Sequence, residues 1–278
     1  MMLRVDRVGI TTVQDLGRRG WAHAGVPRSG AADRFSHRLA NRLVGNPSNA
    51  ASFETSGGLI LTAIDDCFVA ITGAECEVSI DGRAVPHCCS VRLPAGATMR
   101  VDRLVSGVRA YLAVAGGLRG AALLGSLSQD TLSGIVPVPL ASGTTLDVGT
   151  TANSPSSLDV PIMPSGNPML RIDPAPRAAH PGPHGDPGTT QIPVVVSATA
   201  DRIGVRLRGY PVSNPSTGEL ESIPLVRGAI QFTPGGELVV MLADHPTTGG
   251  YPVVGIMHPD DVDRLAQCPP GSSVVLAR

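Results

Sequence analysis

Residues 243–252, with the sequence ADHPTTGGYP, carry more polar groups than a turn between two apolar runs requires. The candidate catalytic groups of this segment are a carboxylate, two hydroxyls and a phenol, on Asp244, Thr247, Thr248 and Tyr251. Gly249 and Gly250 would let backbone N–H groups approach a bound molecule closely. The pattern favours a site for a small polar or anionic molecule. A polar turn closed by an Asx-type hydrogen bond from Asp244 is the alternative interpretation.

A second candidate segment covers residues 25–34, with the sequence GVPRSGAADR. Arg28 and Arg34 flank Ser29 and Gly30 at the expected start of a helix, where unpaired N–H groups and the helix dipole attract anions. We therefore expect these four residues to bind substrate or phosphate. An ordinary capped helix with exposed arginines is the alternative.

Two further charged residues are candidates for binding. Arg202 lies beside Gly204 and Arg206 in an expected strand, so its guanidinium could bind an anion or belong to a charged strand edge. Glu54 lies between an apolar run and a pair of glycines and could be a buried functional acid. A structural ion pair between Glu54 and an arginine is the alternative.

Metal and lysine-based chemistry are not predicted. His180 and His184 have ligand-like spacing but lie in a Pro/Gly-rich loop, and residues 87–89 (HCC) are too compact for one tetrahedral site. No Gly-x-Ser-x-Gly elbow is present, which argues against a serine hydrolase. All 22 basic residues are arginines, so this chain has no lysine for a P-loop, a pyridoxal Schiff base or attached biotin.

The composition excludes several partner classes. The formal net charge is -1 and aromatic residues make up 3% of the chain, so we expect no binding to nucleic acid or to an acidic membrane surface. The five cysteines form no disulfide-like framework, and no apolar run reaches the length of a membrane helix. The first ten residues carry charges where a signal peptide has its apolar core. We expect a cytoplasmic protein with reduced cysteines.

Short apolar runs separated by Gly, Pro, Asn and Asp predict a mainly β protein. Strands are expected within residues 67–85, with a hairpin turn at Asp81 and Gly82, and within 96–104, 107–117, 143–149, 193–199, 237–244 and 272–278.

Two helices are expected. The first lies within residues 29–47, capped by Ser29 and packed through Phe35, Leu39 and Leu43, and the second lies within 258–268. Residues 150–190 are rich in Pro, Gly and Ser and predict a connection between two β-rich domains, 1–160 and 161–278.

Six segments, in order along the chain, resemble one family. They are residues 11–54, 71–74, 108–117, 197–207, 227–236 and 243–252. In these segments the chain is similar to the biotin-dependent carboxyltransferase-like family, also described as the second-subunit family of allophanate hydrolase. The resemblance extends through nearly the whole chain.

The resemblance implies a fold of two tandem cyclophilin-like β-barrel domains with a few short helices. It also implies a complex with a KipI-like partner and a LamB/YcsF-like partner that cleaves 5-oxoproline to glutamate with hydrolysis of ATP. The complex would then bind ATP and a small amide, and this chain would hold no metal or covalent cofactor.

The resemblance also transfers to individual residues. The family's Gln-Thr-Thr-Gly-Gly-Tyr-Pro loop falls on residues 246–252, where Pro246 replaces the glutamine, and the glutamine of its Gly-Ala-Ile-Gln motif falls on Gln231. The stretch after Ile172 lacks the family's usual motif. In the implied mechanism the lactam oxygen is phosphorylated and water opens the ring, with donors from the 247–251 loop and Arg28 or Arg202. Asp244 would orient water or a threonine.

Two other activities are open within the same resemblance. One is a role in a complex that acts on a urea-derived amide, as in allophanate hydrolase or urea carboxylase, which requires a separate biotinylated protein in the carboxylase case. The other is a KipA-type regulator that binds and antagonises a KipI-like inhibitor of a sensor kinase.

Overall fold

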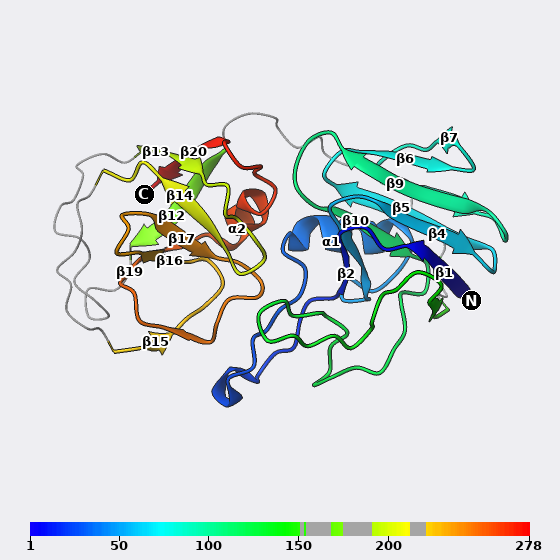
Figure 1. The fold of residues 1–278 in the computed structure, drawn as a ribbon, viewed down its shortest axis with the longest axis horizontal. Helices are drawn as coiled ribbons and strands as arrows, with labels where there is room; N and C mark the ends of the chain where they lie inside the picture. Colours follow the sequence, from blue (N-terminus) through cyan, green and yellow to red (C-terminus); the bar gives the residue numbers. More distant parts are fainter. Residues whose placement is uncertain (151–152, 154–167, 175–190, 212–220) are drawn as a thin grey trace. The chain divides into compact units, whose positions relative to one another are not determined.

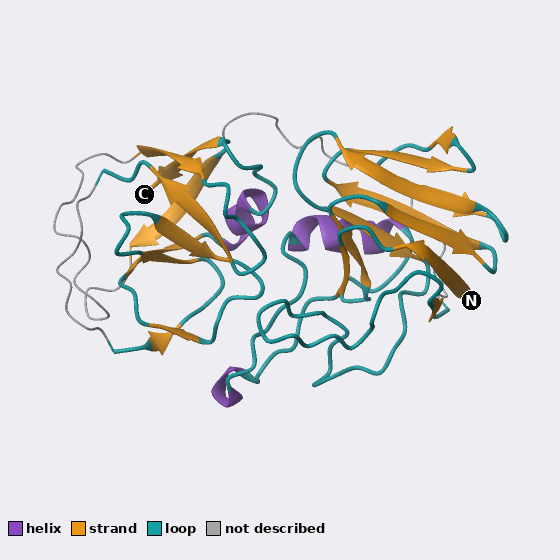
Figure 2. Ribbon diagram, viewed as in Figure 1, coloured by secondary structure: helices purple, strands orange, loops and turns teal. Residues whose placement is uncertain are grey.

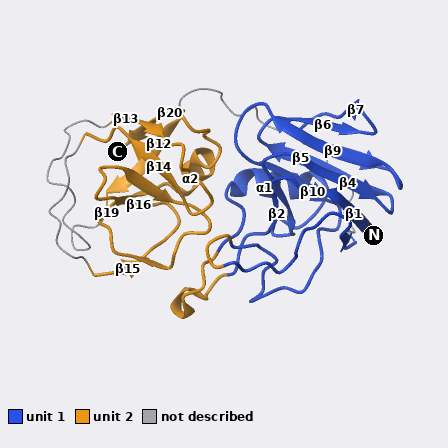
Figure 3. Ribbon diagram, in the orientation of Figure 1, with its two compact units in different colours: residues 1–18, 29–130, 134–163 blue, residues 19–28, 131–133, 164–278 orange. Residues whose placement is uncertain are grey.

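The computed structural model describes residues 1–150, 153, 168–174, 191–211 and 221–278. The chain forms two compact units (Figure 3). Unit 1 comprises Met1–Arg18, Ser29–Asp130 and Gly134–Met163, and unit 2 comprises Arg19–Arg28, Thr131–Ser133 and Pro164–Arg278. The boundary predicted between residues 160 and 161 lies outside the described residues and stays a prediction.

The first sheet of unit 1 has six antiparallel strands (Figure 1). Their order across the sheet is β11 (Thr145–Asp147), β1 (Met2–Arg7), β4 (Leu59–Ala63), β9 (Thr98–Leu104), β6 (Cys76–Ile80) and β7 (Arg83–Ala84). Side chains alternate along β1, so Leu3 and Val5 face the core while Arg4 faces outward. Asp81 and Gly82 both have positive φ between β6 and β7, which confirms the predicted hairpin.

The second sheet of unit 1 has five antiparallel strands and shares its core with the first. Their order is β2 (Thr11–Gln14), β3 (Ser52–Thr55), β10 (Ala110–Val114), β5 (Cys67–Gly73) and β8 (Ser90–Leu93). Every residue of β10 is buried, because the common core covers one face and a helix covers the other. An all-apolar run such as AYLAV is the composition that two covered faces favour.

Helix α1 (Arg34–Leu43) begins later than its sequence signals predict. Asp33 is its N-cap and its carboxylate accepts a hydrogen bond from the Ser36 N–H at 2.9 Å, so the expected cap at Ser29 is wrong. Phe35 is 44% exposed and does not belong to the packed face. The buried residues of the helix are Ser36, His37, Ala40, Asn41 and Leu43.

Unit 2 is built on a closed barrel of seven strands. Their order around the barrel is β12 (Met169–Pro174), β19 (Val253–Met257), β16 (Ala229–Phe232), β17 (Leu238–Met241), β14 (Gly204–Arg208), β13 (Gln191–Val196) and β20 (Ser273–Ala277). The parallel pairing of β12 with β20 closes the ring, and the other neighbouring strands are antiparallel. Ile230, Phe232 and Val240 are completely buried, as alternation along β16 and β17 requires for inward-facing positions.

Four smaller elements complete the described part of unit 2 (Figure 2). Strands β15 (Ile223–Pro224) and β18 (Thr248–Gly249) form a separate two-stranded sheet, η1 (Ala22–Ala24) is a single 3-10 turn, and α2 is Pro259–Leu265. Pro259 starts α2 and Asp260 and Asp261 follow in its first turn, which confirms the predicted second helix.

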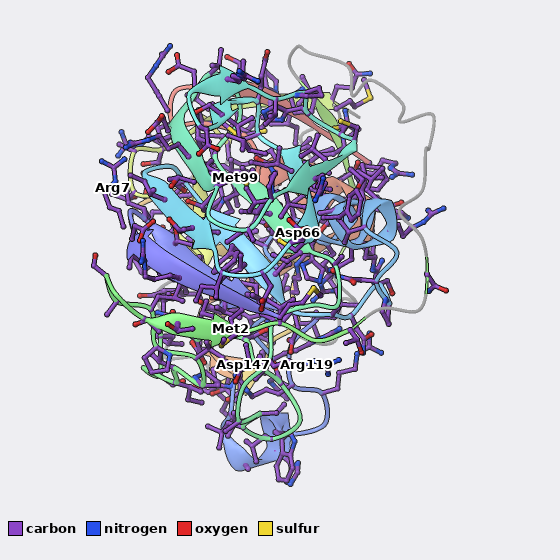
Figure 4. The ribbon with its side chains drawn as sticks, turned by 90° about the vertical axis from the view of Figure 1, so that its right-hand side faces the viewer. Met2, Arg7, Asp66, Met99, Arg119 and Asp147 are labelled. Atoms are coloured by element: carbon purple, nitrogen blue, oxygen red, sulfur yellow. The ribbon has the colours of Figure 1, made fainter. Side chains whose placement is uncertain are left out.

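The edge strand β11 shows how distant segments join in unit 1. Met2 pairs with Asp147 across β1 and β11, and the Arg119 N–H donates to the Asp147 carbonyl at 2.8 Å. Figure 4 labels these three residues along this edge of the sheet.

The predicted mainly β fold with a few short helices is confirmed. One expected barrel is the closed ring of unit 2, whereas the strands of unit 1 form two sheets around one core. Among the described residues, no helix combines the length and apolar character needed to cross a bilayer.

Candidate functional site

The 247–251 loop forms a flap with residues 223–225 in unit 2. Thr248 and Gly249 pair with Pro224 and Ile223, and the Leu225 N–H donates to the Thr247 carbonyl at 2.9 Å. Beneath the flap lies an apolar cluster on the outside of the barrel, made by Leu225, Ala229, Met241 and Val253 with Ile223 and Val239 at its margin. The apolar cluster fixes the position of a loop whose own side chains are polar.

Gln231 lies on the same outer face and contacts the loop directly. Its Nε2 donates to the Tyr251 carbonyl at 3.2 Å, and the residue is 4% exposed. A Cβ at Gly249 would lie 2.6 Å from the Gln231 Nε2 and 2.7 Å from the Leu225 Cδ1. A side chain at position 249 would therefore require the ends of Gln231 and Leu225 to shift.

The polar side chains of the loop face outward. Thr248 and Tyr251 are exposed, Thr247 is half-buried, and Gly250 is exposed. Within the described part of the chain, the hydroxyls of Thr247, Thr248 and Tyr251 have no hydrogen-bond partner. They are available to a ligand, and their catalytic roles stay predictions.

Asp244 has a different environment from the rest of its segment. Its carboxylate accepts from the Arg202 Nε at 2.9 Å and from the Arg202 Nη2 at 3.0 Å, and the aspartate is completely buried. It also accepts from the Thr131 N–H at 3.0 Å and the Thr131 hydroxyl at 2.7 Å. These bonds join a buried ion pair to Thr131. The roles predicted for Asp244 and Arg202 in orienting water and binding anions stay predictions.

Thr131 is a residue that sequence reasoning missed. It lies 113 positions before Asp244 and belongs to no motif, so no local signal connects the two. The Asx-type turn considered for Asp244 stays an alternative beside this long-range contact.

The 27–34 segment is divided between the two units. Arg28 is half-buried in unit 2, whereas Ser29, Gly30 and Arg34 lie in unit 1. The Ser29 hydroxyl donates to the Gln129 carbonyl at 3.1 Å, and its φ of 59° is unusual for a residue other than glycine. A Cβ at Gly30 would lie 2.8 Å from the Gly17 nitrogen. Ser29 and Gly30 thus pack against chain segments near residues 17 and 129, and their binding roles stay predictions.

Glu54 is a buried acid, and it lies near Arg109, as expected if Glu54 forms a structural ion pair. Its Oε1 lies 3.5 Å from the Arg109 Nε, and its Oε2 accepts from the Tyr111 hydroxyl at 2.7 Å and the Ala32 N–H at 2.9 Å. The Tyr111 oxygen accepts from the Asp33 N–H at 2.8 Å. Glu54 and Tyr111 therefore hold the backbone that leads into α1. Burial, followed by the nearby Glu54 charge, raises the pKa of Tyr111 well above its ordinary value.

A second buried network in unit 1 surrounds Asp15, which sequence reasoning also missed. Its carboxylate accepts from the hydroxyls of Ser126 at 2.7 Å and Ser128 at 2.5 Å, and from the Leu127 N–H at 2.8 Å. The Arg18 Nη2 donates to the Ser128 carbonyl. The network joins residues that lie 111 or more positions from Asp15, so only the folded chain shows it.

Metal ligands do not gather in the described residues, where no group of three or more His, Cys, Asp or Glu could hold an ion. His87 instead lies against Cys76, with its Nε2 2.9 Å from the Cys76 carbonyl and 3.4 Å from its Sγ. Burial raises the pKa of Cys76 to about 12, so its thiol is protonated at neutral pH. His180 and His184 lie outside the described residues.

The sequence from residue 24 to residue 278 matches the family described as carboxyltransferase domain, subdomain A and B. The chain belongs to this carboxyltransferase family. The predicted family is thereby confirmed, and the matched residues include the flap, Gln231 and the Asp244–Arg202 pair of this family member.

Relatives of this carboxyltransferase-family chain fall into two groups. It is 34% identical to the C subunit of 5-oxoprolinase from Escherichia coli strain K12, over 98% of this chain and 90% of the relative. It is 28% identical to the C subunit of 5-oxoprolinase from Haemophilus influenzae, over 95% and 86%. Urea amidolyase of Saccharomyces cerevisiae is 30% identical over 95% of this chain, which covers only 16% of that protein.

Solved structures share the fold. The chain superimposes on TTHA0988 with a TM-score of 0.84 and 36% identity, covering all of this chain and 55% of that one. It superimposes on the urea amidolyase of K. lactis with a TM-score of 0.85 and 24% identity, which shows the fold alone. The chain thus spans about half the length of the TTHA0988 chain.

Proposed function

We propose that this chain is the C-type component of an ATP-dependent 5-oxoprolinase complex, which hydrolyses the lactam of 5-oxo-L-proline to L-glutamate. The observation that carries the proposal is the near end-to-end match with two proteins named as the C subunit of 5-oxoprolinase. The match with urea amidolyase covers a small part of a much longer protein. The 5-oxoprolinase relatives, in contrast, match along most of their own length, which favours them as the functional counterpart.

In this proposal a KipI-like partner and a LamB/YcsF-like partner complete the complex in the cytoplasm. This chain has no lysine, so any ATP phosphates near it are held by guanidinium, backbone or partner groups. Phosphorylation of the lactam oxygen makes the ring carbon electrophilic, and a first water adds to it. The ring C–N bond then breaks, with a proton passing to the nitrogen, and leaves a γ-glutamyl phosphate. A second water releases phosphate and gives glutamate. The exposed hydroxyls of the 247–251 loop supply donors to the oxygens that gain charge.

The test is reconstitution of the complex. This chain and its two partners are expressed together, and glutamate and phosphate are measured with 5-oxo-L-proline in the presence and absence of ATP. We expect ATP-dependent glutamate formation that disappears when this chain is omitted. Full turnover by the two partners alone would contradict the proposal.

A urea-type function is the second candidate, because matches to urea amidolyase and to a putative urea carboxylase cover 95% of this chain. A complex of this kind consumes a urea-derived amide, and its carboxylase form contains a biotinylated protein that an avidin blot detects. A biotinylated partner together with no 5-oxoproline turnover would favour this candidate. Inhibition of a KipI-like kinase inhibitor without any turnover would favour a KipA-type regulator.

A further inference from the structure

The amide of Gln231 is held in one orientation beneath the flap. Its Nε2 lies 3.2 Å from the Tyr251 carbonyl, which can only accept a hydrogen bond. The nitrogen, and not the oxygen, must therefore face Tyr251. This contact makes the Gln231 Oε1 a fixed acceptor directed away from that carbonyl.

The Oε1 of Gln231 has no donor within the described part of the chain. The glutamine is 4% exposed, and the one hydrogen bond of its side chain is the donation to Tyr251. This oxygen is not among the completely buried side-chain atoms without a hydrogen bond, so a bound group that carries an N–H or O–H can reach it.

The loop beside this oxygen is built without side-chain bulk. Gly249 packs so closely that an added Cβ would lie 2.6 Å from the Gln231 Nε2, so no other side chain can take its place without moving the amide. In the same loop Thr248 and Tyr251 are exposed and Thr247 is half-buried. A small molecule that offers an N–H finds an acceptor in the Gln231 Oε1.

We propose that the Gln231 Oε1 accepts the ring N–H of the substrate and thereby selects lactams over lactones of the same shape. This inference rests on the proposed 5-oxoprolinase function. A lactone has a ring oxygen where the lactam has N–H, so two acceptor oxygens would then face each other. A polar site left unpaired in this way rejects the analogue more strongly than an apolar pocket does.

The experiment measures binding without chemistry. Binding of labelled 5-oxo-L-proline to the complete complex is measured by equilibrium dialysis in the absence of ATP, with 5-oxotetrahydrofuran-2-carboxylate as the competing lactone. We expect the wild-type complex to prefer the lactam by about 10- to 100-fold. Gln231→Met removes both hydrogen-bonding groups at similar length, and its preference should fall to about threefold or less.

The matched variant is Gln231→Glu, which keeps an acceptor oxygen but loses the donation to Tyr251. Gln231→Glu should retain most of the preference for the lactam over the lactone. This holds even if the lost bond to Tyr251 moves the loop and weakens binding of both compounds. A wild-type complex without lactam preference, or a Gln231→Met complex that keeps the full preference, overturns the inference. If Gln231→Met folds poorly, Gln231→Glu carries the variant test, and its loss of the lactam preference would overturn the inference.

Turnover separates this inference from the proposed function. If the wild-type complex hydrolyses 5-oxoproline and the lactam preference is independent of Gln231, only the inference about Gln231 is wrong. If the complete complex neither binds nor hydrolyses 5-oxoproline, the proposed function fails and the inference falls with it.

Discussion

The carboxylate of Asp244 and the guanidinium of Arg202 form a buried two-point ion pair, with nitrogen–oxygen distances of 2.9 Å and 3.0 Å. Thr131 adds two further donors to the same carboxylate. The pair joins the strand region at 202 to the segment that leads into the flap. Asp244 is thus placed to position the loop, whatever its part in the chemistry.

Asp244→Asn should strongly destabilise the protein. It removes the carboxylate charge from a buried ion pair, and breaking such a pair typically costs about 3–5 kcal/mol. The Asp66–Arg92 pair has a similar distance of 2.8 Å, but both side chains are more than half exposed. Asp66→Asn should therefore change the free energy of unfolding far less than Asp244→Asn does. Urea unfolding of both variants measures the difference, and equal effects would contradict a structural role for the buried pair.

Gly249→Ala should disturb the flap. The new Cβ would meet the Gln231 Nε2 and the Leu225 Cδ1 at 2.6 Å and 2.7 Å, so the ends of these two flexible side chains must shift. We expect weaker 5-oxoproline binding by the complex together with a modest loss of stability. Gly235→Ala, where the nearest atom lies at 3.8 Å, is the matched control in the same unit. Unchanged binding in Gly249→Ala would show that the loop tolerates displacement.

Acid should destabilise the fold through His37. Burial, the largest cause, lowers the pKa of this histidine to about 4 from an ordinary value of 6.5. Between these values the unfolded chain binds a proton that the folded chain does not. Stability is therefore complete above pH 6.5 and falls towards pH 4, by on the order of 3 kcal/mol. Urea unfolding across this range should show a weaker pH dependence in His37→Gln, whereas the exposed-site variant His23→Gln should match the wild type.

Alkali should destabilise the fold through Tyr111. Its folded pKa is raised well above 10 by burial and by Glu54, so above pH 10 the unfolded chain releases a proton that the folded chain retains. Stability is then fully present below pH 10 and declines as the pH rises. The raised pKa values of Cys67 and Cys268, both about 11, act in the same direction.

Tyr111→Phe tests that contribution. Guanidinium unfolding between pH 9 and pH 11 should show a shallower decline than in the wild type, although the loss of the bond to Glu54 lowers stability at neutral pH by about 1–3 kcal/mol. Absorbance at 295 nm reports tyrosinate directly in the same samples. Tyr251→Phe removes an exposed phenol and should leave the alkaline decline unchanged. An equally steep decline in Tyr111→Phe would assign the effect to the cysteines.

Local sequence signals predicted the elements that depend on neighbouring residues. The Asp81–Gly82 turn, the run AYLAV of β10 and Pro259 at the start of α2 are all where their chemistry requires them. The start of α1 was misplaced because Ser29 and Asp33 are both good caps. The choice between them is made by Tyr111 and Glu54, which bind the backbone of residues 32 and 33 from distant strands.

The sequence by itself determined the family, the mainly β fold and the polar character of the 247–251 loop, because motifs, alternation and turn residues are local properties. Only the tertiary structure decided which polar groups are committed to the fold. The Asp244 carboxylate binds Arg202 and Thr131, and the Glu54 carboxylate binds Tyr111 and Arg109. The side-chain hydrogen bond of Gln231 uses its nitrogen, and its oxygen has no donor among the described residues. Hydrogen bonds between residues far apart in the sequence depend on the packing of the whole chain, which no local pattern contains.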